Sequence, residues 1–412
     1  MARVRRRTLL SAGASSLVAG GAVWGLVDGG PFVRVAVSWS AEELAAFRDV
    51  LARHRDDRTE VIPLGDDIEA ALGARTAGRP NMVALPKPGH VVGNADNLVP
   101  IPADVWRPEY NWIWPQPRPY ALPFKIAHGS VVWYRRKLFG ERGWTAPSTW
   151  DDWLALNRKI AATGLAPLAL GGADGWMLDS WFENILLRNH TRTYDDLARA
   201  HNADLWRGDE VRETFTMLAE MWRAPGAVSG GPQRALLQQY PDAVMEVFRY
   251  DRAAMVFAPS FAESVTRMFN VPDEEIDTFV FPGTTVNPDA PLAVAGDLLV
   301  LTQPASDKTL ELLRFLATPD APLPWIANTG GFIAANPDTP TTGYSPTLSR
   351  LASALRAQGE NVRFDLSDQL GAVGGREGLQ RALQDLLEQL GAGEPTTTVV
   401  DRAVQKMVSV EG

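Results

Sequence analysis

Apolar and polar positions after residue 32 change period several times, which predicts strands and helices in alternation. The expected order is strand 33–39, helix 40–54, strand 60–64, helix 67–77 and strand 81–86. Strands that alternate with helices in this way indicate a parallel sheet with helices on both faces. Ligands of such sheets bind at the carboxyl ends of the strands, which is where Trp39, Lys87 and Gly89 are expected.

The alternation continues after an irregular crossover at residues 100–123, which contains several Pro and Trp. Further strands are expected at 130–134, near 253–257, at 279–282 and at 291–301, and helices at 149–162, 179–189, 209–223, 309–316 and through most of 362–412. A chain of 412 residues exceeds the size of one ordinary core. We therefore expect an α/β protein of two lobes, residues 33–127 plus 290–335 and residues 128–289 plus 336–412.

Residues 1–32 predict export. Arg5, Arg6 and Arg7 precede an uncharged run from Thr8 to Val27 that is rich in Gly, Ala and Ser. The twin-arginine pattern is typical of a signal peptide, and the length also suits one membrane-spanning anchor. The chain has no cysteine, so neither a disulfide nor a lipid-modified cysteine is available. We expect a protein outside the cytoplasm, either free or held by an uncleaved helix.

The charge balance argues against nucleic acid as a partner. The formal net charge is −9, and residues 1–32 contribute +3, from four arginines and one aspartate. The remainder therefore carries −12. An acidic body repels a phosphate backbone, so we expect no binding to nucleic acid.

Aromatic rings and carboxylates recur at the ends of the elements expected between residues 120 and 183. Trp176 follows a Gly-rich turn, and Trp181 and Glu183 lie on the helix after it. Aromatic faces cover the apolar faces of a pyranose ring, and carboxylates accept hydrogen bonds from its hydroxyl groups. The pattern therefore indicates a sugar-binding cleft.

Ten short segments, in this order and spacing, resemble the family 1 extracellular solute-binding proteins, the carbohydrate receptors of ABC importers. The last two are similar to the alpha-glucoside-binding subgroup. They are 39–42 (WSAE), 122–125 (LPFK), 133–139 (WYRRKLF), 147–153 (PSTWDDW), 175–183 (GWMLDSWFE), 252–255 (RAAM), 295–297 (AGD), 329–332 (TGGF), 363–368 (RFDLSD) and 371–374 (GAVG).

The resemblance implies a periplasmic-binding-protein type II fold, in which two α/β lobes close about a hinge on a ligand between them. It implies a monomer without cofactor that delivers an oligosaccharide or alpha-glucoside to the membrane subunits of an ABC transporter. Two features depart from the family pattern. Asn81 stands where the family usually has an aspartate, and Gly21 stands where secreted relatives usually carry the cysteine that is lipidated.

The tryptophans have two interpretations. Trp39 and Trp176 either stack under a sugar face or are simply part of the core, since Trp is highly buried on average. Trp133, Trp150 and Trp153 are expected in the core, because they occupy packing positions on strands and helices.

The charged candidates have two interpretations as well. One of Asp365 and Asp368 accepts two sugar hydroxyls, or the two are a helix N-cap and a surface charge. Lys125 donates to a sugar oxygen or is a solvated crossover residue, and Glu42 contacts ligand or only stabilises a helix N-terminus. Four more residues from the matching segments complete the expected ligand-binding set: Asp179, Trp181, Asp297 and Phe332.

Two other classes of function stay open. A glycoside hydrolase needs two carboxylates that flank the scissile bond, and nothing marks one pair among the many carboxylates here. A sensor that presents a sugar to a membrane signalling partner would suit an uncleaved anchor. The five histidines show no metal-ligand spacing, so we expect no metal, no cofactor and no catalytic residues.

Overall fold

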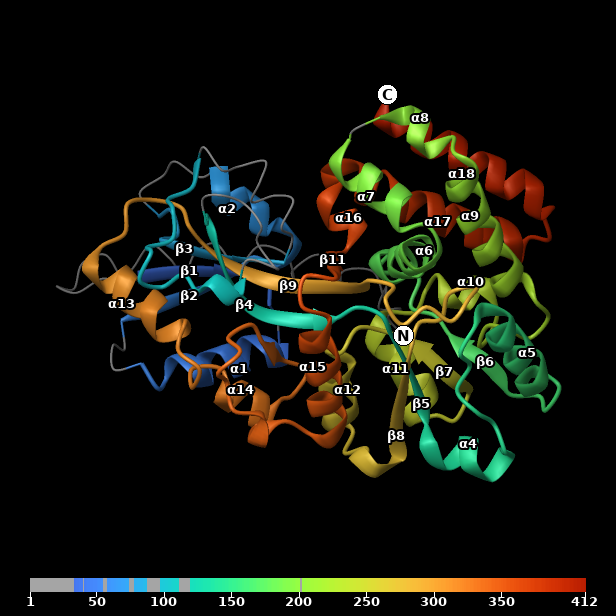
Figure 1. Cartoon of the computed structure of the whole chain (residues 1–412), viewed down its shortest axis with the longest axis horizontal. Helices are drawn as coiled ribbons and strands as arrows, with labels where there is room; N and C mark the ends of the chain where they lie inside the picture. The colour runs from blue at the N-terminus through green and yellow to red at the C-terminus, as the bar shows by residue number, and fades with distance from the viewer. Residues whose placement is uncertain are drawn as a thin grey trace, which may run out of the picture.

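The computed structural model describes residues 33–39, 41–54, 58–73, 78–86, 97–110, 119–200 and 202–412. The expected leader and two of the residues expected near the ligand, Lys87 and Gly89, lie outside this part of the chain. Two α/β lobes lie side by side along the longest axis of the molecule (Figure 1). Within the described residues, no helix is long and apolar enough to cross a membrane.

The first lobe is built on a seven-stranded sheet in the order β10-β4-β9-β3-β1-β2, with β11 beside β9. Its strands are β1 (Val33–Val37), β2 (Thr59–Pro63), β3 (Met82–Leu85), β4 (Ala121–His128), β9 (Leu292–Leu301), β10 (Ile333–Ala334) and β11 (Val362–Phe364). β1 pairs in parallel with both β2 and β3, which confirms the predicted parallel unit. β9 runs antiparallel between β3 and β4.

Helices cover both faces of this sheet. α2 lies above it and α1 and α14 lie below it in the view of Figure 1. The helices that follow these strands in the chain are α1 (Ala41–Leu51), α2 (Ala70–Gly73), α13 (Asp307–Leu316), α14 (Leu323–Asn328) and α15 (Pro346–Gln358). α1 packs on α14, so the first and last thirds of the chain meet there.

The second lobe is built on a four-stranded sheet in the order β6-β7-β5-β8. Its strands are β5 (Val131–Arg135), β6 (Ala166–Ala169), β7 (Ala253–Phe257) and β8 (Ile276–Val280). Its helices are α4 (Arg136–Arg142), α5 (Trp150–Ala161), α6 (Trp176–Asn189), α7 (Thr191–Arg199), α8 (Ala203–Trp206), α9 (Asp209–Arg223), α10 (Pro232–Ala235), α11 (Tyr240–Phe248), α12 (Ala262–Met268), α16 (Leu366–Gln369), α17 (Leu379–Gly391) and α18 (Thr396–Glu411).

The start of β4 corrects one prediction. Residues 100–123 were expected to be irregular throughout, but β4 begins at Ala121 and is buried along its whole length. The misleading residue is Pro123, which cannot donate a ladder hydrogen bond and argues against a central strand. The β4–β9 register shifts between Pro123 and Lys125, and this irregularity accommodates the proline.

The chain passes between the lobes at a buried polar crossing between β4 and β5. The Gly129 carbonyl accepts a hydrogen bond from Asn184 of α6 at 3.2 Å. The Ser130 hydroxyl accepts one from the Ala293 N–H at 2.9 Å. The division into residues 33–127 plus 290–335 and 128–289 plus 336–412 stays a prediction. β11, in the second range, pairs with β9, and α15 contacts both β4 and β8.

The core of the second lobe is aromatic. Trp133, Trp150 and Trp153 are at most 3% exposed, which confirms their expected place in the core. α5 begins where the Thr149 hydroxyl accepts a hydrogen bond from the Asp152 N–H at 3.2 Å, a typical N-cap.

Candidate functional site

A lysine and two carboxylates meet on the first lobe. The β4–β9 register places Lys125 opposite Asp297, and Lys125 Nζ lies 3.7 Å from Asp297 Oδ2. Glu43, in the first turn of α1, forms a direct ion pair with the same ammonium group. Lys125 is only 5% exposed and Asp297 7%, so this pair lies in a poorly hydrated place, while Glu43 reaches solvent. The single ammonium group offsets the charge of only one of the two carboxylates.

Burial and pairing act in opposite directions on these groups. Burial lowers the pKa of Lys125, but Glu43 and Asp297 outweigh it, so the pKa of Lys125 is raised and the ammonium stays charged. Burial raises the pKa of Asp297, as does Glu43, while Lys125 and the Trp39 indole lower it. The net result for Asp297 is a pKa above its ordinary value.

Aromatic rings surround this charged group on the first lobe. Trp325 lies with its ring centroid 5.1 Å from Lys125 Nζ, a cation–π contact. The ring centroids of Trp39 and Trp325 are 5.0 Å apart, and those of Trp325 and Phe332 are 5.2 Å apart. Phe124 lies 5.1 Å from Phe332, edge to face.

A second aromatic wall comes from the other lobe. Trp176 opens α6, Tyr240 opens α11 and Phe261 precedes α12, and their ring centroids are 5.4–5.8 Å apart. Lys125 Nζ lies 5.8 Å from the Phe261 ring, so the two walls meet at the lysine. Burial and Glu43 raise the pKa of the Tyr240 hydroxyl, which keeps it protonated.

We call these residues the interlobe cluster: Trp39, Glu43, Phe124, Lys125, Trp176, Tyr240, Phe261, Asp297, Trp325 and Phe332. Its second-lobe rings are half-buried, its first-lobe rings are at most 4% exposed, and both sets lie beside a few polar groups. That combination is typical of sites that hold a small molecule in one orientation. Among the described residues, no group of histidines and carboxylates is arranged to hold a metal ion.

A separate group of carboxylates lies where α6 meets α16. Glu183 is fully buried, and its Oε1 accepts a hydrogen bond from the Ser367 N–H at 2.7 Å. Burial raises the pKa of Asp365 well above its ordinary value, and Glu183, Asp368 and Asp179 raise it further. The structure therefore brings Asp179 and Asp365 together, in a group of four carboxylates.

The predicted ligand-binding residues fall into three places. Lys125, Asp297, Trp39, Phe332 and Trp176 belong to the interlobe cluster, and Asp179 and Asp365 belong to the carboxylate group. Trp181 is brought to neither of them. It is fully buried, and its ring stacks on Trp153 at 5.3 Å in the core.

Glu42 is exposed on α1, and its neighbour Glu43 reaches Lys125 instead. Four other members of the cluster were missed as well: Phe124, Tyr240, Phe261 and Trp325. Phe261 had a readable signal, because it follows the carboxyl end of β7, where ligands of α/β sheets bind.

A two-lobed α/β fold with a mixed aromatic and charged cluster between its lobes is the architecture of a solute receptor. A family model for bacterial extracellular solute-binding proteins matches residues 67–321. The chain belongs to this family of exported binding proteins.

Two similar proteins are named for the compounds that they bind. The chain is 25% identical over 313 residues to the osmoprotective compounds-binding protein GgtB of Synechocystis sp., covering 72% of this chain and 73% of that protein. It is 29% identical over 267 residues to the alpha-glucosides-binding periplasmic protein AglE of Rhizobium meliloti, covering 62% and 57%.

Solved structures share the fold. The bacterial solute receptor AcbH matches with a TM-score of 0.77 at 17% identity, over 93% of this chain and 98% of that one. The solute-binding protein RafE in complex with raffinose matches with a TM-score of 0.70 at 16% identity, over 92% and 99%.

Proposed function

We propose that this protein binds a carbohydrate, an oligosaccharide or an alpha-glucoside, and delivers it to the membrane subunits of an ABC importer. The observation that carries the proposal is the meeting of two aromatic walls at the Lys125, Glu43 and Asp297 group. Trp176, Tyr240 and Phe261 on the second lobe are half-buried and offer stacking surface for the face of a pyranose. The first-lobe rings are at most 4% exposed in this arrangement. The charged group offers donors and acceptors for its hydroxyls, and charge-assisted hydrogen bonds orient a ligand strongly.

The relatives support a sugar as the ligand class. AglE is named for alpha-glucosides, and another relative, from Streptococcus mutans, is named a multiple sugar-binding protein. That relative is 27% identical over 202 residues. Under this proposal Trp39, Lys125, Trp176, Asp297 and Phe332 contact ligand.

Glu43, Tyr240, Phe261 and Trp325 join these residues as ligand contacts. Asp179 and Asp365 act from the carboxylate group, and Glu42 acts from the first turn of α1. The protein works as a monomer without catalytic turnover, and residues 1–32 direct it out of the cytoplasm or hold it at the membrane.

A thermal-shift screen of the chain without its leader, over mono- and disaccharides, tests the proposal. A sugar present at about 100 times its dissociation constant adds roughly 2.7 kcal/mol to the free energy of unfolding, which raises the melting temperature by several degrees. The set includes maltose, trehalose, sucrose, raffinose and glucosylated polyols, with amino acids as negative controls. A chain that responds to none of the sugars at millimolar concentration, but responds to a compound of another class, would refute the proposal.

A further inference from the structure

A partly buried ion pair joins the two lobes beside the interlobe cluster. Glu263 and Arg267 lie one turn apart on α12, between two strands of the four-stranded sheet. Glu263 is 1% exposed, and its Oε1 accepts hydrogen bonds from Arg267 Nε and Nη2 at 3.1 and 3.0 Å. The helix that follows Phe261 therefore carries an ion pair joined by two hydrogen bonds.

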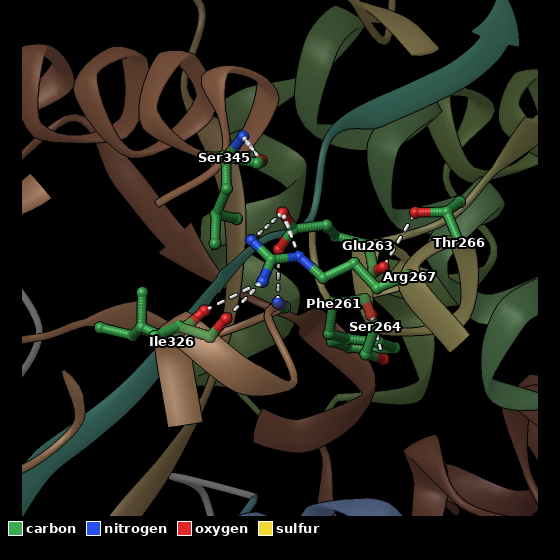
Figure 2. Close-up of polar contacts among 10 residues, drawn as sticks. Phe261, Glu263, Ser264, Thr266, Arg267, Ile326 and Ser345 are labelled. Carbon is green, nitrogen blue, oxygen red and sulfur yellow. Dashed lines mark hydrogen bonds and ion pairs between the residues drawn. The ribbon is translucent and has the colours of Figure 1, made fainter. Parts of the chain in front are cut away.

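Both partners also reach the other lobe. Glu263 Oε2 accepts a hydrogen bond from the Gly331 N–H at 2.6 Å. Arg267 Nη1 donates to the carbonyls of Ile326 and Ala327, at the end of α14, at 3.3 and 3.0 Å. Figure 2 shows the guanidinium group between Glu263 on one side and the end of α14 at Ile326 on the other.

The sequence of the facing turn suits this contact. Gly330 and Gly331 both have positive φ, 74° and 68°, which side chains other than glycine rarely adopt. A Cβ at Gly330 would lie 2.6 Å from both Arg267 Nε and Glu263 Oε2, and a Cβ at Gly331 would lie 2.9 Å from the Phe261 carbonyl oxygen. The two glycines therefore let the turn approach α12 closely enough for the hydrogen bonds to form.

The contact ties one wall of the cluster to the other. Phe261 lies two residues before Glu263, and Phe332 follows the glycine turn directly. We infer that Glu263 and Arg267 form a latch that holds the two lobes in the closed arrangement. They are positioning residues, because their contacts are with the protein. The inference deepens the proposed function and rests on it for the role of the closed state.

The latch is testable without any ligand, by measuring the distance between the lobes. The chain has no cysteine, so introduced cysteines can be labelled selectively. Asp49→Cys on α1 and Lys137→Cys on α4 are exposed sites on different lobes, and spin labels on them report the distance between the lobes. We expect the ligand-free labelled protein to populate a short distance that fits this structure, beside a longer one. Arg267→Gln loses charge-assisted hydrogen bonds to both lobes, so the ratio of short to long populations should fall roughly ten- to a hundredfold.

Two further variants complete the test. Gly330→Ala alters the latch from the opposite lobe and should also lower the short-distance population. Arg381→Gln is the matched control, because it breaks an i,i+4 pair with Asp385 (2.9 Å) inside α17 alone, and it should leave the distribution unchanged.

The latch is overturned if Arg267→Gln and Gly330→Ala show the same distance distribution as the labelled protein without these substitutions. This holds even if the variants melt at lower temperatures. This result would leave the thermal-shift screen of the wild-type chain unaffected. The two proposals therefore fail separately.

Discussion

Two tryptophans on one helix show how much a single position decides. Trp176 is half-buried beside Tyr240 and Phe261, whereas Trp181, five residues later, is fully buried against Trp153. Successive helical residues are about 100° apart, so five positions turn the side chain to a different face. The sequence predicted both as ligand contacts, because composition alone does not say which face of α6 meets the other lobe.

Trp176→Ala should weaken sugar binding while the fold survives. Aromatic pairs supply roughly 0.5–1.5 kcal/mol beyond area burial, and lost contact area adds to it. We expect a loss of about 2–3 kcal/mol, at least thirtyfold in dissociation constant, for the tightest sugar of the screen. Calorimetric titration and a melting curve on the same variant measure the two effects.

Trp181→Ala is the control for this experiment, because it truncates a core side chain on the same helix. It should cost about 3–5 kcal/mol of stability and leave the affinity of the folded protein nearly unchanged. Trp176 is not a ligand contact if Trp176→Ala loses stability but keeps its affinity for the sugar.

At the scale of elements, the periodicity of the sequence predicted individual strands and helices, but not which distant strands pair. The parallel unit β1–β2–β3 and the helix Asp209–Arg223 lie where the periodicity placed them. β4 was missed because Pro123 masks it. The pairing of β9 with β3, β4 and β11 joins segments far apart in the chain, and periodicity carries no information about such partners.

The carboxylate group where α6 meets α16 predicts a stabilising substitution. Burial and neighbouring carboxylates raise the pKa of Asp365, so its ionised form is unfavourable in the folded state. Asp365→Asn removes that charge and should raise the free energy of unfolding at pH 7 by about 0.5–2 kcal/mol. The gain should shrink as the pH falls below the folded-state pKa of Asp365 and vanish at about pH 4, where the carboxyl of the unfolded wild-type chain is protonated too.

Denaturant titrations at pH 7 and pH 5 measure this effect. Asp152→Asn is the matched control, because hydrogen bonds from Thr149 and Ser148 lower the pKa of Asp152 and its charge is favourable in the folded state. That variant should lose stability at pH 7. A loss of stability in Asp365→Asn as well would mean that the Asp365 carboxylate has a favourable partner.

The crossing between the lobes predicts an acid response of opposite sign. Burial, followed by the charge of Arg188, lowers the pKa of His128 to about 4. The unfolded chain takes up a proton near pH 6.5, so stability is complete above pH 6.5 and falls as the pH drops toward 4. The expected loss from this one group is about 3 kcal/mol, reached near pH 4.

His128→Asn isolates the contribution of His128 protonation to the pH dependence of stability. Its amide oxygen replaces Nδ1 as acceptor for the Ser130 N–H, a bond of 3.2 Å in the wild type, and asparagine does not titrate. The difference in unfolding free energy between wild type and variant should therefore shrink steadily from pH 7 to pH 4. A constant difference over that range would show that His128 takes up a proton as readily in the folded protein as in the unfolded chain.

For the whole molecule, the chain length and the alternation of strands and helices predicted two lobes, and the structure has them. The places where the chain passes between the lobes were predicted less accurately. β4 ends at His128, where a crossing was expected. However, β11, from the range assigned to the second lobe, joins the first sheet, and α15 bridges the two sheets through its contacts with β4 and β8. Such bridges depend on the assembled sheets, so no local pattern marks them.

Motion of the lobes follows from these connections and is the last prediction. The lobes are joined by crossings of the chain, and they meet at the Lys125–Phe261 contact and at the proposed latch, both of which lie next to the proposed ligand site. A sugar that touches both walls adds contacts available only in the closed arrangement, so it shifts the population toward that arrangement. A saturating amount of the tightest sugar should therefore lower the radius of gyration in solution scattering. Trp176→Ala at the same sugar concentration should compact less, in proportion to its lower occupancy. Identical profiles with and without sugar, under conditions in which calorimetry shows full occupancy, would mean that binding leaves the lobes where they are.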